Sequence, residues 1–222
     1  MTRHSDNPNL HLYWENTFEG MPIMSEKGPF ILEYLVATKR TIERAVDHYP
    51  RVLAFRVDLR FPQDAELPDD AYTNVVISRF IESFKAKIRH DRSRAQGRNP
   101  CARDSRVRYV WAREVGRNRR PHYHLLVLLN RDAYYGVGRL VSSRTNNVRR
   151  MEEAWASALR LPVEQVWGLV HIPERAEYRI DRYIRTGDHD ALPELLHRVS
   201  YLCKAATKSY GDRQRGFGTS RG

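Results

Sequence analysis

One stretch of the sequence, residues 120–130 (RPHYHLLVLLN), limits the fold more than any other. Its second half is continuously apolar, so both faces of an extended strand would be apolar, which is typical of a central strand covered on both sides. Residues two apart on a strand share a face, so His122 and His124 would lie side by side, about 6.5–7 Å apart. Two imidazoles at that spacing can share one metal ion, although two hydrogen-bonded histidines at a core edge account for the same pattern.

Composition narrows the class of protein. The chain has 222 residues, of which 41% are hydrophobic, enough for one domain with extensions and a core. It carries 38 Lys and Arg against 27 Asp and Glu, and this net charge of +11 favours a polyanionic partner such as nucleic acid. Two cysteines give no disulfide framework, and we find no signal peptide, membrane span or P-loop motor. We therefore expect a cytoplasmic protein with no membrane contact.

Hydrophobic periodicity predicts the remaining elements. Further strands are expected at residues 51–61, 107–115 and 166–172, and a short one within residues 10–18. Helices are expected at residues 30–48, 73–90, 139 or 142 to 159, and 192–208, with a helical turn at residues 178–184. Residues 89–100 predict a basic loop, either solvated or in contact with a DNA backbone.

The order of these elements predicts the fold class. Strand, helix, strand, strand, helix, strand is the ferredoxin-like β-α-β-β-α-β arrangement. We therefore predict an α+β fold, a ferredoxin-like antiparallel sheet with an added N-terminal and an added C-terminal helix. The expected divisions are an N-terminal extension over residues 1–50, a main domain over residues 51–208 and a loose basic tail over residues 209–222.

Glu114 offers the histidine pair a third ligand. If residues 116–120 form the hairpin loop, Glu114 lies opposite His122 on the same face of the sheet. A slip of one residue in register would turn it away, and a salt-bridged surface glutamate is the alternative. Two imidazoles and a carboxylate suit Mn²⁺ or Mg²⁺, and ligand type also allows zinc.

Tyr201 and Lys204 are three residues apart on the last expected helix, so they are neighbours outside its buried stripe. A nearby ammonium group or metal ion favours the phenolate form of tyrosine, which is a nucleophile toward phosphorus. Taken alone, Tyr201 is better interpreted as an amphipathic residue at a helix edge than as a nucleophile. Beside a metal site on a basic chain, the pair indicates phosphodiester transfer, with a metal ion polarising the phosphate and Arg and Lys holding its neighbours.

Together these residues resemble the three motifs of the HUH endonucleases, the rolling-circle replication initiators. More narrowly, the chain is similar to inovirus-type replication proteins and to the related prophage proteins of the YagK/YfjJ type, in segments at residues 52–62, 111–130, 200–208 and 215–221. The resemblance implies an HUH endonuclease domain over residues 51–208, a divalent ion, Mn²⁺ or Mg²⁺, on His122, His124 and Glu114, and Tyr201 as the nucleophile. It gives Asp58, on the strand matching the first motif, no defined role beyond that of a salt bridge.

The resemblance further implies nicking of single-stranded or hairpin origin DNA through a 5′-phosphotyrosine, in the cytoplasm of a bacterial host. Lys204 would be catalytic, and a host helicase and polymerase would be partners because the chain has no motor. Candidate DNA contacts are Arg117, Arg119, Arg120 and Lys208. Initiators with two tyrosines carry the second one four residues after the first, where this chain has Ala205. A transposase or mobilisation relaxase with the same chemistry, and a non-enzymatic nucleic-acid-binding protein with aromatic residues on an open sheet, are the alternatives.

Overall fold

The computed structural model describes residues 2–63, 65–116, 120–138, 146–184, 190–208 and 210–221. The main strands are β6 (Arg51–Leu59), β7 (Arg108–Val115), β8 (Pro121–Asn130), β9 (Val170–His171), β10 (Glu177–Asp181) and β11 (Phe217–Thr219). The helices are α1 (Leu32–His48), α2 (Asn74–Arg98), α3 (Asn147–Leu159) and α4 (Ala191–Ser200). The N-terminal segment adds the short strands β1 (Thr2–Arg3), β2 (His11–Tyr13), β3 (Thr17–Phe18), β4 (Met21–Pro22) and β5 (Phe30–Ile31). Single 3₁₀ turns are η1 (Ser25–Lys27), η2 (Val163–Val166) and η3 (Tyr201–Cys203).

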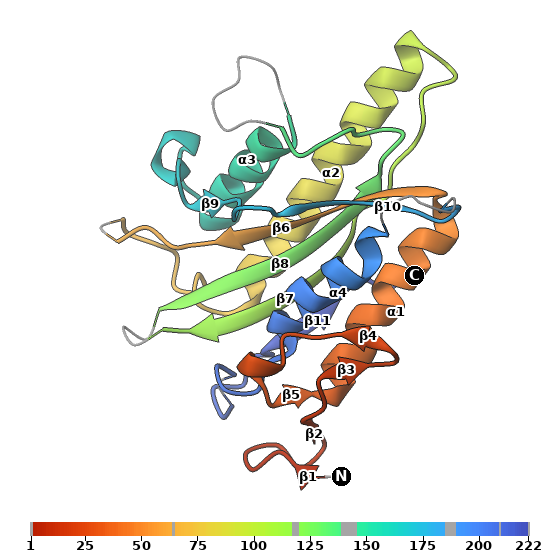
Figure 1. Ribbon diagram of the computed structural model, residues 1–222. Coiled ribbons are helices and arrows are strands. Elements are labelled where there is room, and N and C mark those ends of the chain that lie inside the picture. The colour runs from red at the N-terminus through yellow and green to blue at the C-terminus, as the bar shows by residue number, and fades with distance from the viewer. Residues whose placement is uncertain are drawn as a thin grey trace.

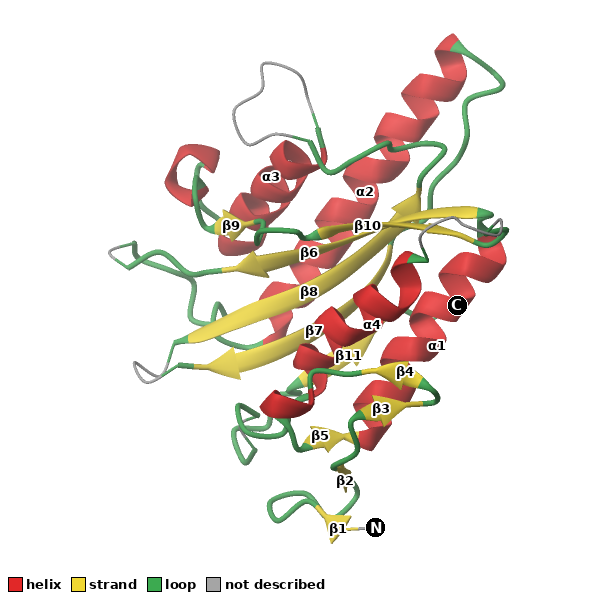
Figure 2. Ribbon diagram, in the orientation of Figure 1, coloured by secondary structure: helices red, strands yellow, loops and turns green. Residues whose placement is uncertain are grey.

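The central sheet has the strand order β10-β6-β8-β7-β11, with every described pairing antiparallel and β9 also paired with β6. The chain passes through β6, α2, β7, β8, α3 and β9–β10 in sequence, with β6 and β8 in the middle of the sheet. This is the expected ferredoxin-like arrangement, so the predicted α+β fold is confirmed. The helices α1 and α4 lie in front of the sheet and α2 and α3 behind it, so that three layers form (Figures 1 and 2).

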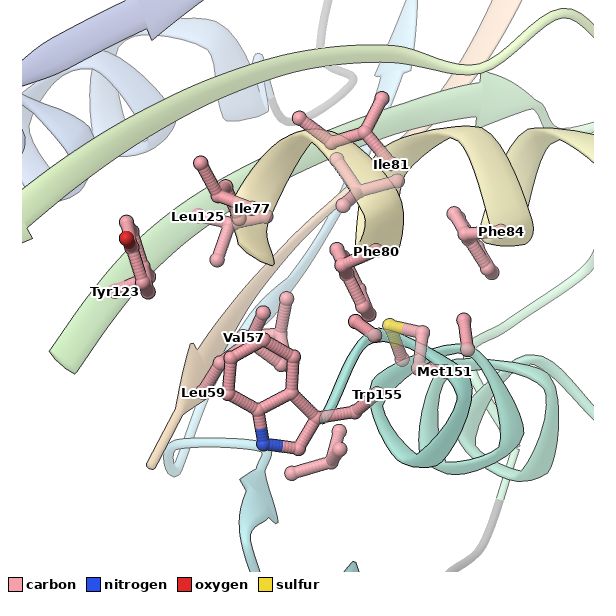
Figure 3. Close-up of a cluster of buried hydrophobic side chains, with 14 of the residues drawn as sticks. Val57, Leu59, Ile77, Phe80, Ile81, Phe84, Tyr123, Leu125, Met151 and Trp155 are labelled. Carbon is pink, nitrogen blue, oxygen red and sulfur yellow. The ribbon is translucent and has the colours of Figure 1, made fainter. Parts of the chain in front are cut away.

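Each face of the sheet has its own core because side chains alternate along the strands. Behind the sheet, Trp155 of α3 is fully buried and packs edge-to-face against Phe80 of α2, with the ring centroids 5.9 Å apart (Figure 3). Its indole nitrogen donates a hydrogen bond to the carbonyl oxygen of Arg60 at 2.8 Å. In front of the sheet, Leu126 and Leu128 of β8 belong to the core under α1 and α4. The histidine face of β8 therefore points toward α4.

The basic loop expected at residues 89–100 is instead the second half of α2, which ends at Arg98. Asp91 holds this half against the protein, because it pairs with Arg150 of α3 and accepts a hydrogen bond from the hydroxyl of Tyr134 at 2.7 Å. The expectation of a loop was wrong because this part of the helix is held against the rest of the protein by polar contacts rather than by an apolar stripe.

Two expectations at the C-terminal half also fail. The helical turn expected at residues 178–184 is the strand β10, in which buried Tyr178 and Ile180 flank exposed Arg179. The strand expected at residues 166–172 shrinks to β9, because residues 163–166 form a 3₁₀ turn.

The tail expected to be loose contributes β11, an edge strand that pairs with β7. Gly218 lies opposite Trp111, where an added Cβ would come within 2.6 Å of the indole ring.

The division into residues 1–50, 51–208 and 209–222 stays a prediction. Of the helix expected from residue 139 or 142, the first residues fall outside the described part of the chain, and α3 begins at Asn147. Among the described residues, no helix is both long and apolar enough to cross a membrane.

Candidate active site

The β7–β8 hairpin brings three candidate metal ligands together. Its register places Glu114 opposite His122 and Ala112 opposite His124, so the five-residue loop at residues 116–120 has the expected length. Residues 114, 122 and 124 therefore share the face of the sheet that points toward α4. One ligand atom from each of them lies within 4.8 Å of the other two. These three residues are called the HHE cluster below.

Glu114 is the centre of the HHE cluster and is almost fully buried. Its Oε2 atom lies 3.6 Å from His122 Nε2 and 3.5 Å from His124 Nε2. Burial would raise the pKa of Glu114, but the contacts with the two histidines and the charge of Lys208 outweigh burial and hold this pKa well below its usual range. A buried carboxylate is thus kept ionised and in reach of two imidazoles, which is a donor set suited to a divalent cation.

The protonation of His124 also fits a metal ligand. Its Nδ1 atom lies 2.5 Å from Asp58 Oδ1, and because an ionised carboxylate can only accept, the Nδ1–H group donates this hydrogen bond. Its Nε2 atom is buried, has no hydrogen-bond partner among the described residues and faces Glu114. Burial lowers the pKa of His124, but Asp58 and Glu114 together raise it above its usual value. A metal ion would take the place of the second proton on Nε2.

Asp58 is a site residue whose role could not be assigned from the sequence. It lies on β6, directly opposite His124, because β6 is the neighbour of β8 in the sheet. Its carboxylate also pairs with Arg56 Nη2 at 3.2 Å, and its other oxygen lies 3.7 Å from His171 Nδ1. Asp58 therefore orients His124 in the way that outer carboxylates orient metal-bound histidines. The only signal in the sequence was its place among the polar positions of the alternating segment at residues 51–61.

The segment that carries Tyr201 differs from the expected helix over residues 192–208. The α-helix ends at Ser200, and residues 201–203 form the 3₁₀ turn η3. The N-terminal segment draws the chain away from the helix axis, because Lys204 forms a β-bridge with Phe30 and the Ala205 amide donates to the carbonyl oxygen of Pro29 at 2.9 Å. Tyr201 and Lys204 remain neighbours, but a pairing with the N-terminal segment, rather than helical spacing, sets their geometry.

Tyr201 lies against the HHE cluster. Its ring meets the ring of His124 edge-on, with centroids 5.5 Å apart. The Lys204 ammonium lies 3.6 Å from the centroid of the tyrosine ring and 3.2 Å from Glu114 Oε1. The two oxygens of Glu114 thus face different partners, Oε1 the lysine and Oε2 the histidines. Tyrosine, lysine and candidate metal ligands form one continuous group.

A family model, the YagK/YfjJ C-terminal domain, matches residues 14–220 of the chain. The chain belongs to this family. The uncharacterized protein YfjJ of Escherichia coli (strain K12) is 35% identical over 205 residues, which cover 89% of this chain and 98% of YfjJ. The uncharacterized protein YagK of the same strain is 36% identical over 200 residues, which cover 87% of this chain and 95% of YagK.

Among solved structures, this YagK/YfjJ-family chain matches the N-terminal nuclease domain of the non-structural protein 1 of minute virus of mice. That domain is described as having a unique Zn²⁺ coordination in its active site pocket and a novel mode of DNA recognition at the origin of replication. The sequences are 11% identical, the match covers 85% of this chain and 78% of that domain, and the TM-score is 0.29. A likeness of this size carries no conclusion about the chemistry of the family member.

The expected DNA contacts divide into three cases. Arg117 and Arg119 lie outside the described residues. Arg120 is exposed and donates hydrogen bonds to the carbonyl oxygens of Pro62 and Gln63, so it fixes a loop beside the hairpin. Lys208 is 8% exposed, and burial lowers the pKa of its ammonium to about 8, against the opposing pull of Glu114. Lys208 is thus a buried cation near the HHE cluster of this YagK/YfjJ-family protein, and a role in DNA binding stays a prediction.

Proposed function

We propose that this chain is a metal-dependent tyrosine DNA endonuclease and strand transferase of the HUH type. It would nick single-stranded or hairpin origin DNA in the bacterial cytoplasm and so start rolling-circle replication. The observation that supports this most is the contact between Tyr201 and His124, at a ring centroid distance of 5.5 Å, beside a cluster whose ligand atoms lie within 4.8 Å of one another. A candidate nucleophile thereby adjoins a candidate site for the cation that phosphoryl transfer requires.

The chain's own residues can carry out both halves of the transfer. Tyr201 lies beside the Lys204 ammonium and gives its phenol proton to solvent as it reacts. The phenolate oxygen attacks phosphorus, and the bond between phosphorus and the 3′ oxygen breaks. Lys204 can protonate that oxygen, which leaves as a free 3′-OH for a polymerase, while the 5′ phosphate stays bonded to Tyr201. In the second half, a 3′-OH gives its proton to the now neutral Lys204 and attacks the phosphotyrosine, and the tyrosine oxygen leaves as the phenolate.

His122, His124 and Glu114 would hold the metal ion, and Asp58 would keep His124 in the correct orientation. The bound Mn²⁺ or Mg²⁺ would neutralise negative charge that develops on the phosphate. The donor set also accepts zinc. Because the sequence has no P-loop, strand separation would depend on a host helicase, and extension of the 3′-OH on a host polymerase.

The decisive experiment follows the covalent intermediate. Labelled single-stranded oligonucleotides tiled across the DNA that flanks the gene are incubated with the protein and Mn²⁺, and adducts are resolved by denaturing electrophoresis. We expect nicking and a protein–DNA adduct with wild type, and neither with Tyr201→Phe. Tyr210→Phe is the matched control, because Tyr210 packs on His4 with ring centroids 4.8 Å apart, and it should retain both. Equal products from wild type and Tyr201→Phe would refute the assignment.

Two alternatives make different predictions. A transposase or mobilisation relaxase would use the same chemistry, so only its DNA substrate would separate it from a replication initiator. A non-enzymatic binder with an RNA-type platform needs aromatic side chains on an open sheet. Helices cover both faces of this sheet, and the aromatic residues Phe55 and Tyr123 of its central strands are fully buried, which counts against such a platform. Calorimetric titration with Mn²⁺ distinguishes the endonuclease from the non-enzymatic binder. The endonuclease should bind Mn²⁺ and lose that affinity in His122→Ala/His124→Ala. A non-enzymatic binder should show no such loss.

A further inference from the structure

A basic groove lies at the end of β7 opposite to Glu114. It has a volume of about 440 Å³ and is lined by Lys85, Ile88, Arg89, Asp104, Ser105, Arg106, Val107, Ser220 and Arg221. These residues come from α2, from the segment before β7 and from the end of the chain. Figure 1 shows α2 projecting beyond the sheet at this end, away from the turn of the β7–β8 hairpin. At 3.3 Å per residue, the length of β7 separates the groove from the HHE cluster by about 23 Å.

The positive charges of this groove are mostly uncompensated. The side chains of Arg89, Arg106 and Arg221 are exposed and have no ion-pair partner among the described residues, and Asp104 is the one acidic residue in the lining. The lysines of α2 differ from these arginines, because Lys85 in the lining pairs with Glu82 at 2.9 Å and Lys87 on the neighbouring side pairs with Glu153 at 2.8 Å. Like charges that gather without counterions repel one another, and an anionic ligand would relieve this repulsion.

The groove also presents hydroxyl donors. Ser105 and Ser220 are buried, and their oxygen atoms accept hydrogen bonds from the amides of Asn130 at 3.0 Å and Tyr109 at 3.2 Å. A serine oxygen that accepts a backbone N–H still has its own O–H to donate. Guanidinium groups and hydroxyl donors are the side-chain groups that contact phosphate oxygens in protein–DNA complexes. The ligand chemistry of the groove is therefore that of a phosphate backbone.

The lining points to a duplex rather than a single strand. Sites for single-stranded nucleic acid combine basic residues with aromatic side chains on which bases stack. Among the described residues that line this groove none is aromatic, and the half-buried Tyr109 ring is in contact with Lys85, its centroid 5.5 Å from the ammonium. A duplex keeps its bases stacked inside and offers only its backbone, so it needs no stacking platform. The 23 Å between groove and HHE cluster equals about six or seven base pairs at a rise of 3.4 Å.

We propose that this groove binds the phosphate backbone of the duplex DNA that flanks the strand cut at Tyr201. That Tyr201 cuts the adjoining strand rests on the proposed function. Binding of duplex DNA in the groove requires neither the metal ion nor Tyr201. The groove would hold the double-stranded part of an origin, while the nearby single strand reaches the tyrosine.

The test measures binding of the full chain to a fluorescein-labelled duplex of about 20 base pairs in EDTA, by anisotropy, at salt concentrations from about 50 to 200 mM. We expect Arg89→Gln/Arg106→Gln to flatten the slope of log K against log salt by about 2, and to weaken binding about 10- to 100-fold at 0.1 M salt, since each lost phosphate contact changes the slope by about 0.9. The matched control is Arg175→Gln/Arg179→Gln, two exposed arginines at the β10 edge, opposite to β11. This control should bind like wild type.

An unchanged slope for the groove variant, or an equal loss in the control, would overturn the proposal. Tighter binding of wild type to single-stranded DNA or to duplex RNA of the same length, lost in the groove variant, would overturn the assignment to duplex DNA. Nicking of short single-stranded oligonucleotides by the groove variant at the wild-type rate would support it. If Tyr201→Phe still nicks DNA while the groove variant loses duplex binding, the proposed nucleophile is wrong and the groove assignment stands.

Discussion

The hydrogen bond between Asp58 and His124 allows a sharp test of the HHE cluster. It fixes the imidazole ring so that Nδ1 faces Asp58 and Nε2, the nitrogen that can bind a metal ion, faces Glu114. In Asp58→Asn the shape of the side chain is kept, but its charge is lost. The amide then offers His124 either a weaker acceptor or an N–H group that opposes the proton on Nδ1. The histidine loses both its orientation and part of the basicity of its ligand nitrogen.

We expect Asp58→Asn to weaken Mn²⁺ binding about 10- to 100-fold, the usual effect of losing the outer partner of a metal-bound histidine. This equals about 1.4–2.7 kcal/mol of binding free energy. The metal-free protein should also lose stability, because Arg56 is 5% exposed and its guanidinium lies 3.2 Å from the Asp58 carboxylate. Loss of the charge that pairs with this buried guanidinium should lower the free energy of unfolding by about 1–3 kcal/mol.

Calorimetric titration with Mn²⁺ measures the first effect and urea denaturation in EDTA the second. Asp70→Asn is the matched control, because Asp70 pairs with Arg79 at the start of α2, away from the HHE cluster. It removes the same charge and should leave Mn²⁺ affinity unchanged. A dissociation constant for Asp58→Asn within twofold of wild type would refute the claim that Asp58 orients a metal ligand.

Three further changes test the packing of the fold. Trp155→Ala should lower the free energy of unfolding by about 3–5 kcal/mol in urea denaturation, since it empties a fully buried position, and a loss below about 1 kcal/mol would contradict the packing. Burial raises the pKa of Asp91, but the hydrogen bond from Tyr134 and nearby arginines lower it below 3.8. The ionised Asp91 carboxylate therefore stabilises the fold fully above pH 3.8, and this stabilisation is lost as the pH falls further. Melting temperatures should therefore fall more steeply at acid pH for wild type than for Asp91→Asn, and parallel curves would be the contrary result. Gly218→Ala should cost about 1–3 kcal/mol in urea denaturation, because its Cβ would meet the Trp111 ring at 2.6 Å, whereas an unchanged midpoint would show that β11 can shift without loss.

The central sheet and the HHE cluster could be predicted from the sequence because local pattern determines both. Alternating apolar residues at 51–61 and a continuously apolar segment at 120–130 identify strands without knowledge of their partners. The five-residue loop then fixes the hairpin register, and the register alone places Glu114 beside His122. Each step needed only neighbouring residues.

The features that the sequence did not reveal depend on contacts between distant segments. Asp58 meets His124 because β6 lies next to β8, although the two residues are 66 positions apart. The second half of α2 has few apolar residues and is held by Asp91 through α3. The segment at residues 178–184 is too short for its alternation to outweigh a helical interpretation, and pairing with β6 makes a strand of residues 177–181.

The N-terminal segment explains why Tyr201 lies where it does. The hydroxyl of Ser200 accepts a hydrogen bond from the amide of Met24 at 2.9 Å, across 176 positions of sequence, and Phe30 forms a β-bridge with Lys204. These contacts end α4 and hold the tyrosine segment against the sheet. The HHE cluster needs only the β7–β8 hairpin, with Asp58 on the adjacent strand, whereas the placement of Tyr201 also needs residues 24–30. Metal binding and strand cleavage would therefore rest on separate parts of the fold, and damage to the N-terminal segment should weaken cleavage before it weakens metal binding.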